Sequence, residues 1–474
     1  MRLLAGLLLC AHSVAQTHAT PMAGPWFPAS RTGLLETLDR SYAAARLRGT
    51  PPRPGLLALV VPHAGMDYSG AVAAAAWRLL PAAPGNIILL AFSHRTPYNE
   101  VLAPNLDAYT TPLGETKVNR SVLDQLGFRR VDEKTLCDHS LENQLPFLRR
   151  AAPNATITPL YVGDLDAASL AAAARKLSLR LQQGDLIVAS SDFTHFGAAY
   201  RYTPYPNDAK LRSRLRDLAN QAFEAIGSLH PATFDRHLVT TRDTICGANP
   251  IRLLMATLAA HRNDVYMSTI DYRTSSDVTG DWSTSVGYAA LAFYPASSFR
   301  VDPTSQRRLI AHSRATLESM LDRAPAPVFG IATPALLQHS GAFVTIRKKS
   351  DLRGCVGTLS PTSVLPDTIA DRTLAAARSD PRFPPLSRAE GPVSIELSLL
   401  TPLKLIPDWR VFRLGQGGVI LLGSSGGLLL PQVAREMGWN REQFLEGLSR
   451  KAGLDSTAYR RARLYVFQAQ VFGE

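Results

Sequence analysis

Three apolar runs in this sequence each end at side chains that can bind a metal ion or move a proton. In chain order, these side chains are His63, His94, Asp192 and His195. A further candidate, Cys246, lies in the glycine-flanked turn TICGAN. Two or three imidazoles together with a thiolate or a carboxylate suit a borderline metal such as Fe(II), Zn or Cu. If such a set leaves coordination positions open, substrate or dioxygen can bind there.

The apolar runs that precede these side chains are expected to be buried strands of one sheet. They cover residues 56–61, 86–91 and 185–191 and are rich in Val, Leu and Ile. Helical sequence separates them, as in α/β units with parallel strands. The carboxyl ends of parallel strands meet at one edge of a sheet, where ligands bind. We therefore expect a three-layer α/β sandwich that collects the candidate residues at one edge.

The chain after the first strand is expected to start as a loop. Gly65 and Gly70 favour irregular backbone in this segment. The alanine-rich run 71–80 is then predicted to form the helix that completes the first α/β unit.

Asp138, His139 and Glu142 form a second polar group, at the start of a helix predicted over 140–150. Ser140 or Asp138 can cap this helix, and Glu142 lies in its first turn, where the helix dipole favours a carboxylate. These residues are further candidates for the site of the first domain.

The same region also allows chemistry without a metal. His195 and Asp192 can form an acid/base pair, and Cys246 can act as a nucleophile. Cys246 is expected at a helix start, where a thiol tends to ionise. A single histidine or cysteine is more often a core residue, but three strand ends that deliver such residues to one edge favour the metal site.

Composition bounds the remaining classes of function. The length of 474 residues indicates two or three domains. The net charge is +12, but the basic residues are dispersed and form no long Lys/Arg run, so a nucleic-acid groove is not indicated. The four cysteines, Cys10, Cys137, Cys246 and Cys355, lie far apart without a CxxC motif, so no disulfide framework is implied.

Residues 1–19 resemble a secretory signal peptide. One arginine precedes a short apolar core, and Ser13-Val14-Ala15 places small residues where a signal peptidase needs them. A true signal would make the protein periplasmic or secreted, and a disordered start would leave it cytoplasmic. No other stretch approaches the roughly 20 apolar residues of a membrane helix.

The second half of the chain predicts an α+β domain. After a helix at 305–321, strands at 342–348 and 352–359 flank a short turn and predict a β-hairpin. A helix at 364–378 follows, and the domain is expected to end in one strand over 464–472.

A second candidate site lies in this domain. It comprises Arg353, Cys355, Arg382 and Glu396. The glycines that flank Cys355 suggest close approach by a ligand or another segment. Glu396 stands in an apolar strand, where an unpaired carboxylate is unfavourable, so we expect it to pair with Arg353 or Arg382. A purely structural ion pair is the alternative.

Several motifs of the first half, in this order, resemble the Memo family. They are AGPWFP (23–28), PHAGMDYSG (62–70), SHR (93–95), DHSLENQLPF (138–147), SSDFTHFG (190–197), TICGANPI (244–251) and SVGYAALAFY (285–294). One departure is Ala91-Phe92, where members of that family usually carry a Gly-Pro-like pair. This change alters the loop but keeps His94.

The resemblance implies the LigB-like fold of the class III extradiol dioxygenases, a non-haem iron group. It implies a metal site at His63, His94 and Cys246, with His195 and Asp192 as pocket neighbours. In such a site we expect His195 to move protons and Asp192 to orient His195. Iron is the implied metal, with copper as the alternative. A thiolate in place of the dioxygenase carboxylate argues against ring cleavage.

The second half resembles the AMMECR1 family. The matching segments are GAFVTIRKKSDLRGCVGTLSP (341–361), DPRFPPLS (380–387), VSIELSLLTP (393–402), GGLLLPQVAREMGW (426–439), FLEGLSRKAGL (444–454) and the ending YVFQAQVFGE. Memo-like and AMMECR1-like proteins resemble components of the AmmeMemoRadiSam system, which implies a radical-SAM protein as partner. Export would conflict with such a partner, because a radical-SAM enzyme works in a reducing cytosol.

We therefore expect a possible signal peptide at 1–19, a Memo-like domain at 20–297 and an AMMECR1-like domain at 298–474. The leading hypothesis is metal-dependent redox or oxygen chemistry associated with the radical-SAM partner. The alternative is a non-catalytic module that binds a peptide or a small ligand on a dioxygenase-like fold.

Overall fold

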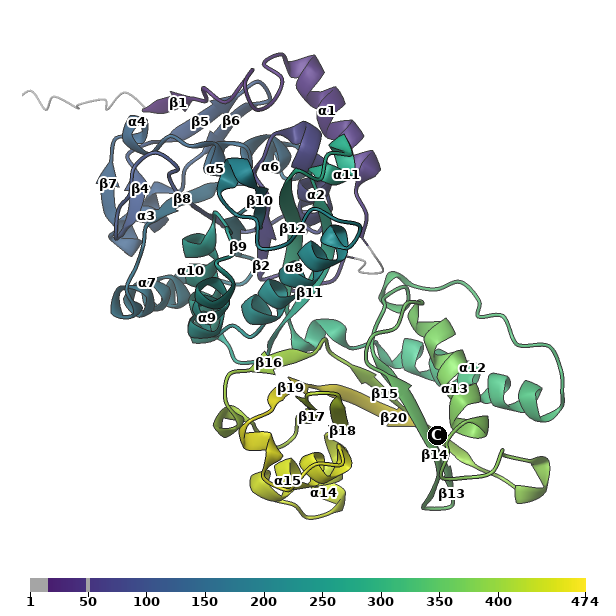
Figure 1. Cartoon of the computed structure of the whole chain (residues 1–474). Helices are drawn as coiled ribbons and strands as arrows, with labels where there is room; N and C mark the ends of the chain where they lie inside the picture. Colours follow the sequence, from purple (N-terminus) through teal and green to yellow (C-terminus); the bar gives the residue numbers. More distant parts are fainter. Residues whose placement is uncertain (1–15, 48–51) are drawn as a thin grey trace, which may run out of the picture.

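The computed structural model describes residues 16–47 and 52–474, and Figure 1 shows them as two bodies joined near residue 300. Residues 1–15, which include the expected cleavage motif, lie outside the described residues. The described chain begins with strand β1 (Thr17–Ala19), which pairs in parallel with β5 (Ala108–Thr111). Strand β6 (Gly114–Lys117) completes this small sheet.

The first domain is built on a nine-stranded mixed sheet. Strands β2 (Ala58–Val61), β9 (Leu186–Ser190) and β3 (Ile87–Ala91) are parallel neighbours in that order. Every residue in them is buried, as expected for continuous apolar runs covered on both faces. The three strands expected from the sequence are therefore adjacent, and their carboxyl ends meet at one edge.

The remaining strands extend this sheet on both sides. The order is β10-β12-β2-β9-β3-β8-β4-β7, with β11 paired to β12. Their bounds are β4 (Val101–Pro104), β7 (Arg129–Val131), β8 (Ile157–Val162), β10 (His195–Gly197), β11 (Val265–Thr274) and β12 (Thr284–Pro295).

Helices pack against this sheet and make the domain a mixed α/β structure (Figure 1). Helix α2 packs on α1, α6 and strands β11 and β12, whereas α10 packs on α7 and on β9 and β8. The helices are α1 (Arg31–Ala44), α2 (Met66–Trp77), α3 (Arg120–Leu126), α4 (Glu133–Leu136), α5 (His139–Glu142), α6 (Leu145–Ala151), α7 (Ala167–Arg180), α8 (Leu211–Gly227), α9 (Pro231–Thr241), α10 (Ala248–His261) and α11 (Ser276–Thr279).

The loop expected after the first strand is shorter than predicted. Helix α2 begins at Met66, so the prediction of a loop that includes Gly70 was wrong. Gly70 lies where α2 crosses α1, and a Cβ there would be 2.6 Å from Ser41 Oγ. This glycine therefore permits close helix packing rather than a turn, a distinction that local sequence does not make.

The second domain contains two four-stranded sheets, in agreement with the α+β prediction. Their orders are β14-β13-β15-β20 and β16-β19-β17-β18. The predicted hairpin is confirmed, because β13 (Ala342–Lys348) and β14 (Asp351–Thr358) are antiparallel neighbours. Helix α12 (Pro303–Leu321) packs on α13 (Leu365–Arg378), which covers β13. The other elements are β15 (Ser394–Leu400), β16 (Lys404–Ile406), β17 (Gly417–Leu422), β18 (Ser425–Leu429), α14 (Gln432–Glu436) and α15 (Arg441–Lys451).

The expected closing strand is two strands in different sheets. Strand β19 (Arg463–Phe467) pairs with β16 and β17, whereas β20 (Ala469–Gly473) pairs with β15. Gln468 separates them, and its N–H donates to Thr401 Oγ1 at 3.0 Å. Gln468 and Gln470 interrupt the apolar run here, but polar residues also occur within strands, so the change of sheet was not predicted.

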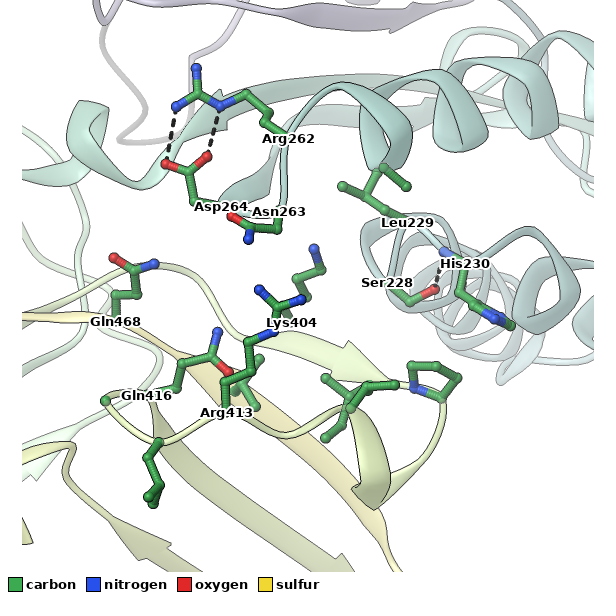
Figure 2. Close-up of a pocket in the computed structure, with 17 residues that line it drawn as sticks. Ser228, Leu229, His230, Arg262, Asn263, Asp264, Lys404, Arg413, Gln416 and Gln468 are labelled. Atoms are coloured by element: carbon green, nitrogen blue, oxygen red, sulfur yellow. Dashed lines mark hydrogen bonds and ion pairs between the residues drawn. The ribbon is translucent and has the colours of Figure 1, made fainter. Parts of the chain in front are cut away.

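The two domains meet along α8, β11 and β16. A cavity of about 540 Å³ lies at this boundary, and Figure 2 shows Lys404 and Arg413 pointing into it. The Lys404 ammonium donates to the Val265 carbonyl at 3.3 Å, and Arg463 pairs with Glu224 across the boundary. The boundary is therefore polar and carries ion pairs as well as apolar contacts. Within the described residues, no helix combines the length and apolar character needed to span a bilayer.

Candidate metal centre

The carboxyl ends of β2 and β3 and the turn before α10 bring three metal-binding side chains together. One nitrogen each of His63 and His94 and the sulfur of Cys246 all lie within 4.8 Å of one another. His63 comes two residues after β2, and His94 three residues after β3. Parallel neighbouring strands explain this convergence of residues that are distant in the sequence.

His63 is held rigidly at the base of the site. Its ring Nδ1 lies 3.0 Å from Ser190 Oγ, and its Nε2 lies 3.3 Å from Cys246 Sγ. Its carbonyl accepts a hydrogen bond from Asn143 at 2.6 Å. Burial and the nearby His94 lower the pKa of His63 to about 3, so the imidazole is neutral. A neutral ring that offers Nε2 toward the sulfur is the form that binds a metal.

His94 is oriented by a buried carboxylate. Asp138 accepts hydrogen bonds from the His94 backbone N–H at 2.8 Å and lies 2.9 Å from the ring Nδ1. Burial alone would raise the pKa of Asp138, but its hydrogen bonds and the charge of His94 hold that pKa near 2. The carboxylate therefore stays ionised and leaves Nε2 of His94 free to face the site. Carboxylate–histidine pairs of this kind commonly support metal ligands.

Aromatic stacking fixes the outer side of His94. The His139 ring stacks on His94 with centroids 4.3 Å apart, and the Trp26 ring stacks on His139 at 3.9 Å. Trp26 was noted only within a family motif, and its place at the site was not predicted. No sequence signal indicated this stack, because Trp26 and His139 are joined only through the fold.

Cys246 is positioned by the turn before α10. A Cβ on the neighbouring Gly247 would lie 2.4 Å from the Ser190 carbonyl, so only glycine allows this approach to β9. The Asp192 N–H donates to the Cys246 sulfur at 3.3 Å. Burial and the Asp192 carboxylate raise the pKa of Cys246 well above its ordinary value. Burial and the Asp192 charge therefore oppose the ionisation of this thiol that a helix start favours.

Asp192 and His195 lie beside the three ligands but have different partners. Asp192 accepts from the N–H groups of His63 at 2.8 Å and Ala64 at 3.3 Å. His195 receives its orientation from Thr244, whose hydroxyl and carbonyl lie 2.7 and 3.1 Å from its backbone N and ring Nδ1. Burial raises the pKa of Asp192 to about 6. Atoms of Asp192, His195 and Cys246 also fall within 4.8 Å of one another.

An open cavity of about 650 Å³ leads to these residues. Its walls combine aromatic and polar side chains, and Tyr68, Tyr200 and Tyr288 are among them. His63, His94, Asp192 and His195 all line it. The cavity is large enough for a small organic ligand beside the candidate metal position.

The second polar group of the first domain divides between two places. Asp138 and His139 lie at the candidate centre, whereas Glu142 points away from it and contacts His18 and Cys137. Residues three or four apart share a helix face, so this separation does not follow from the short helix α5 alone. This division was not apparent from the spacing of the three residues.

Only some of the candidate residues of the second domain lie close together. Arg353 forms a two-pronged ion pair with Glu390 at 2.6 and 2.7 Å. Arg382 pairs in the same manner with Asp380, at 2.9 and 2.6 Å, and Asp380 also accepts from the Cys355 N–H at 2.8 Å. Both arginines lie over the Phe383 ring, at 5.5 and 5.6 Å.

The prediction that Glu396 pairs with Arg353 or Arg382 was wrong. Both arginines are engaged by other carboxylates, and the buried Oε1 of Glu396 has no hydrogen-bond partner among the described residues. In the sheet, Thr345 pairs with both Cys355 and Glu396, so the three residues form one row across β14, β13 and β15.

The close approach predicted at the glycines around Cys355 comes from the protein itself. A Cβ on Gly354 would lie 2.2 Å from the Ala376 carbonyl of α13. A Cβ on Gly357 would lie 2.2 Å from the Phe343 ring. These glycines therefore allow helix and ring packing, and the geometry does not require a ligand.

Comparisons with known proteins agree with this division of the chain. The family described as Memo-like protein matches residues 18–292, and the AMMECR1 family matches residues 310–472. The chain is 32% identical to Protein MEMO1 of Xenopus laevis over 285 residues, which cover 57% of this chain and 95% of that protein. Identity to human Protein MEMO1 is 30% over the same length and coverage.

Two solved structures are similar over part of the chain. An uncharacterized protein of Pyrococcus horikoshii is 30% identical and covers 37% of this chain and 94% of its own, with a TM-score of 0.35. An uncharacterized protein of Escherichia coli is 12% identical and covers 50% of this chain and 99% of its own, with a TM-score of 0.30.

Proposed function

Because the chain belongs to the Memo family over residues 18–292, with an AMMECR1 domain at 310–472, we propose that it performs metal-dependent redox or oxygen chemistry. The metal is held by His63, His94 and Cys246. We also propose that the first domain has the three-layer, extradiol dioxygenase-like architecture expected from the sequence. The observation that carries the proposal is the approach of these three ligand atoms to within 4.8 Å of one another, beside an open cavity that His63 and His94 line.

The residues present fit a borderline divalent metal. Two imidazoles and one sulfur form a mixed set that suits iron, copper or zinc better than magnesium or calcium. His63 and His94 each have the Nδ1 partner that supports binding through Nε2. A bound cation also reverses the effect of burial on Cys246, because a coordinating thiol loses its proton.

The metal supplies redox capacity and an acidic coordination position for a ligand entering from the cavity. The chain's own residues hold the metal ligands in place and transfer protons. Asp192 holds the backbone of His63 and Ala64, and the pKa of this carboxyl near 6 lets it exchange a proton around neutral pH. His195, fixed by Thr244, lines the cavity and moves protons to or from the bound ligand.

The metal we propose is iron, with copper as the second choice. A two-histidine set that leaves positions open for oxygen or substrate favours Fe(II), and the sulfur donor, which prefers softer ions, is the reason for copper as the alternative. The AMMECR1 domain is fused to the same chain, which raises its effective concentration beside the centre. We infer that both halves serve one pathway, with a radical-SAM protein as the third participant.

Metal content tests this proposal directly. Full-length protein purified without oxygen is expected to hold about one iron or copper ion per chain at this centre, and His63→Ala and Cys246→Ala to lose it. His261→Ala and Cys355→Ala, which change a surface histidine and a cysteine of the other domain, are matched controls and keep the metal. Wild-type protein that binds neither added Fe(II) nor copper would exclude the redox function.

A binding module on the same fold is the second candidate. The aromatic walls around the 650 Å³ cavity, including the Trp26–His139 stack, support recognition of a planar or peptide ligand. Chelation separates the two functions, because a redox enzyme loses turnover without metal. A binding module would keep its ligand affinity after the same treatment.

A further inference from the structure

A second group of metal-binding side chains lies outside the candidate centre. His18 of β1, Cys137 at the end of α4 and Glu142 of α5 meet in the first domain. Cys137 Sγ lies 2.8 Å from Glu142 Oε1 and 3.6 Å from His18 Nε2. His18 Nε2 lies 3.3 Å from the same carboxylate oxygen. One nitrogen, one sulfur and one oxygen donor therefore face a common point.

This group is buried and incompletely hydrogen-bonded. Glu142 is 0% exposed and Cys137 6%, whereas the His18 side chain keeps 13% of its surface accessible. The second oxygen of Glu142, Oε2, is buried without a hydrogen-bond partner among the described residues. The adjacent Glu133 is also buried, and its Oε2 likewise lacks a partner there. Buried carboxylate oxygens without partners are unfavourable unless a cation or a donor compensates them.

The donor spacings resemble those around tetrahedral zinc. Bond lengths of about 2.0 Å to N and O and about 2.3 Å to S place N and O donors about 3.3 Å apart, and S and N donors about 3.5 Å apart. The corresponding distances here are 3.3 and 3.6 Å. The sulfur–oxygen distance of 2.8 Å is shorter than in such a site, so the Glu142 carboxylate must rotate slightly when a metal enters.

We propose that His18, Cys137 and Glu142 bind a structural Zn²⁺ ion, or a similar borderline divalent cation. Thiolate and carboxylate together carry two negative charges, so a divalent cation makes the buried group neutral. The fourth position faces water or Glu133. The partly exposed His18 offers the route by which the ion enters.

The alternative for the same atoms is a metal-free hydrogen-bond cluster. In that arrangement the Cys137 thiol donates to Glu142, and His18 pairs with the same carboxylate. Cys137 and His18 then both contact Oε1 of Glu142, and its buried Oε2 has no hydrogen-bond partner among the described residues. A metal ion removes this imbalance because it replaces the thiol proton and draws charge from the whole carboxylate.

The proposed ion would stabilise the neighbouring candidate centre. Cys137 and Glu142 flank Asp138 and His139, which orient and stack on His94. The ion would join strand β1 to helix α5 and so hold this short segment in place. Zinc at the second site is therefore expected to act on the first site through position, without contacting the cavity.

Zinc and cobalt titrations of the full chain test the proposal. The variants are Cys246→Ser, the double variant Cys137→Ser/Cys246→Ser and the combination His18→Gln/Cys246→Ser, with Cys355→Ser/Cys246→Ser as the matched cysteine control. Chelated Cys246→Ser protein is expected to take up Co²⁺ with thiolate-to-cobalt charge-transfer absorption, which Zn²⁺ displaces. That absorption should vanish in the double variant, and adding His18→Gln to Cys246→Ser should weaken Zn²⁺ binding by about 10-fold or more, whereas adding Cys355→Ser should not.

Thermal unfolding supplies a second readout. Zn²⁺ should raise the Tm of Cys246→Ser but not that of the double variant, because only a native-state site stabilises the fold. His18 lies on a partly exposed terminal strand, so His18→Gln tests the site even if Cys137→Ser fails to fold. Equal Zn²⁺ affinity in Cys246→Ser with and without His18→Gln, and no cobalt–thiolate absorption in Cys246→Ser, would overturn the proposal. Each of these proteins lacks Cys246 and therefore the candidate centre, so the two proposals fail separately.

Discussion

At the scale of single residues, the candidate centre depends on side chains that orient its histidines and are not themselves proposed metal ligands. Asp138 orients His94, Ser190 faces His63, and Thr244 orients His195. Each interaction fixes one nitrogen of an imidazole and leaves the other for the cavity. The chemistry of the histidines therefore depends on these neighbours as much as on the rings.

Replacing Asp138 by Asn should weaken metal binding without unfolding the domain. Asn can still cap α5, but it lacks the charge that fixes the His94 ring. We expect a 10- to 100-fold loss of affinity for Fe(II) or copper, measured by competition with a chelator of known affinity. Asp166→Asn, at the exposed cap of α7, is the matched control and should bind normally. Unchanged affinity in Asp138→Asn would show that His94 needs no carboxylate partner.

At the scale of elements, a glycine allows the close packing of α1 on α2. Gly70 sits at that crossing, and the helix extends back to Met66, just below the site. Tight contact at a glycine brings the helix nearer to its neighbour than any larger residue allows.

Gly70→Ala should therefore destabilise the first domain, despite the better helix propensity of alanine. The added Cβ would meet Ser41 Oγ at 2.6 Å, and overpacking of this kind costs about 1–3 kcal/mol. In a Ser41→Ala background the obstructing oxygen is gone, so the same substitution should be neutral or stabilising by up to about 1 kcal/mol. Urea unfolding of the four proteins measures both effects. Equal effects of Gly70→Ala in both backgrounds would contradict the packing explanation.

At the scale of the whole molecule, the boundary between the domains holds cations in a confined space. Lys404 and Arg413 point into the boundary cavity, while Arg262 is paired with Asp264 at 2.7 Å on its far wall (Figure 2). Burial lowers the pKa of Lys404 to about 8, and the charge of Asp264 opposes this only in part. The boundary therefore disfavours the protonated lysine.

This shift makes stability depend on pH in a defined direction. The unfolded chain binds the Lys404 proton up to pH about 10.5, and the folded chain only up to about 8. Between these values the unfolded state holds more protons, so stability contributed by this group rises with pH. The penalty for the buried charge is complete below pH 8 and relieved above pH 10.5.

Lys404→Met removes this penalty. Relative to wild type, its advantage in unfolding free energy should shrink by on the order of 2 kcal/mol between pH 7 and pH 10.5. Urea unfolding at several pH values gives this difference, and Lys134→Met, which removes an exposed lysine, is the matched control. A difference that stays constant over this range would mean that Lys404 is not desolvated at the boundary.

The sequence alone determined the two-domain division and the sheet edge that collects His63, His94 and Asp192. Buried apolar runs specify strands through local composition, and polar residues directly after them must lie at strand ends. The motifs around these residues resemble the Memo family, and the motifs of the second half resemble the AMMECR1 family. The matches at 18–292 and 310–472 confirm both families.

Only the tertiary structure decided which side chains meet across long distances in the chain. It separated Glu142 from Asp138 and His139, joined Glu142 to His18, and gave Arg353 and Arg382 partners other than Glu396. It also divided the final apolar run between two sheets at Gln468. These outcomes depend on helix phase, strand register and the packing of distant segments, which local patterns of hydrophobicity and charge do not encode.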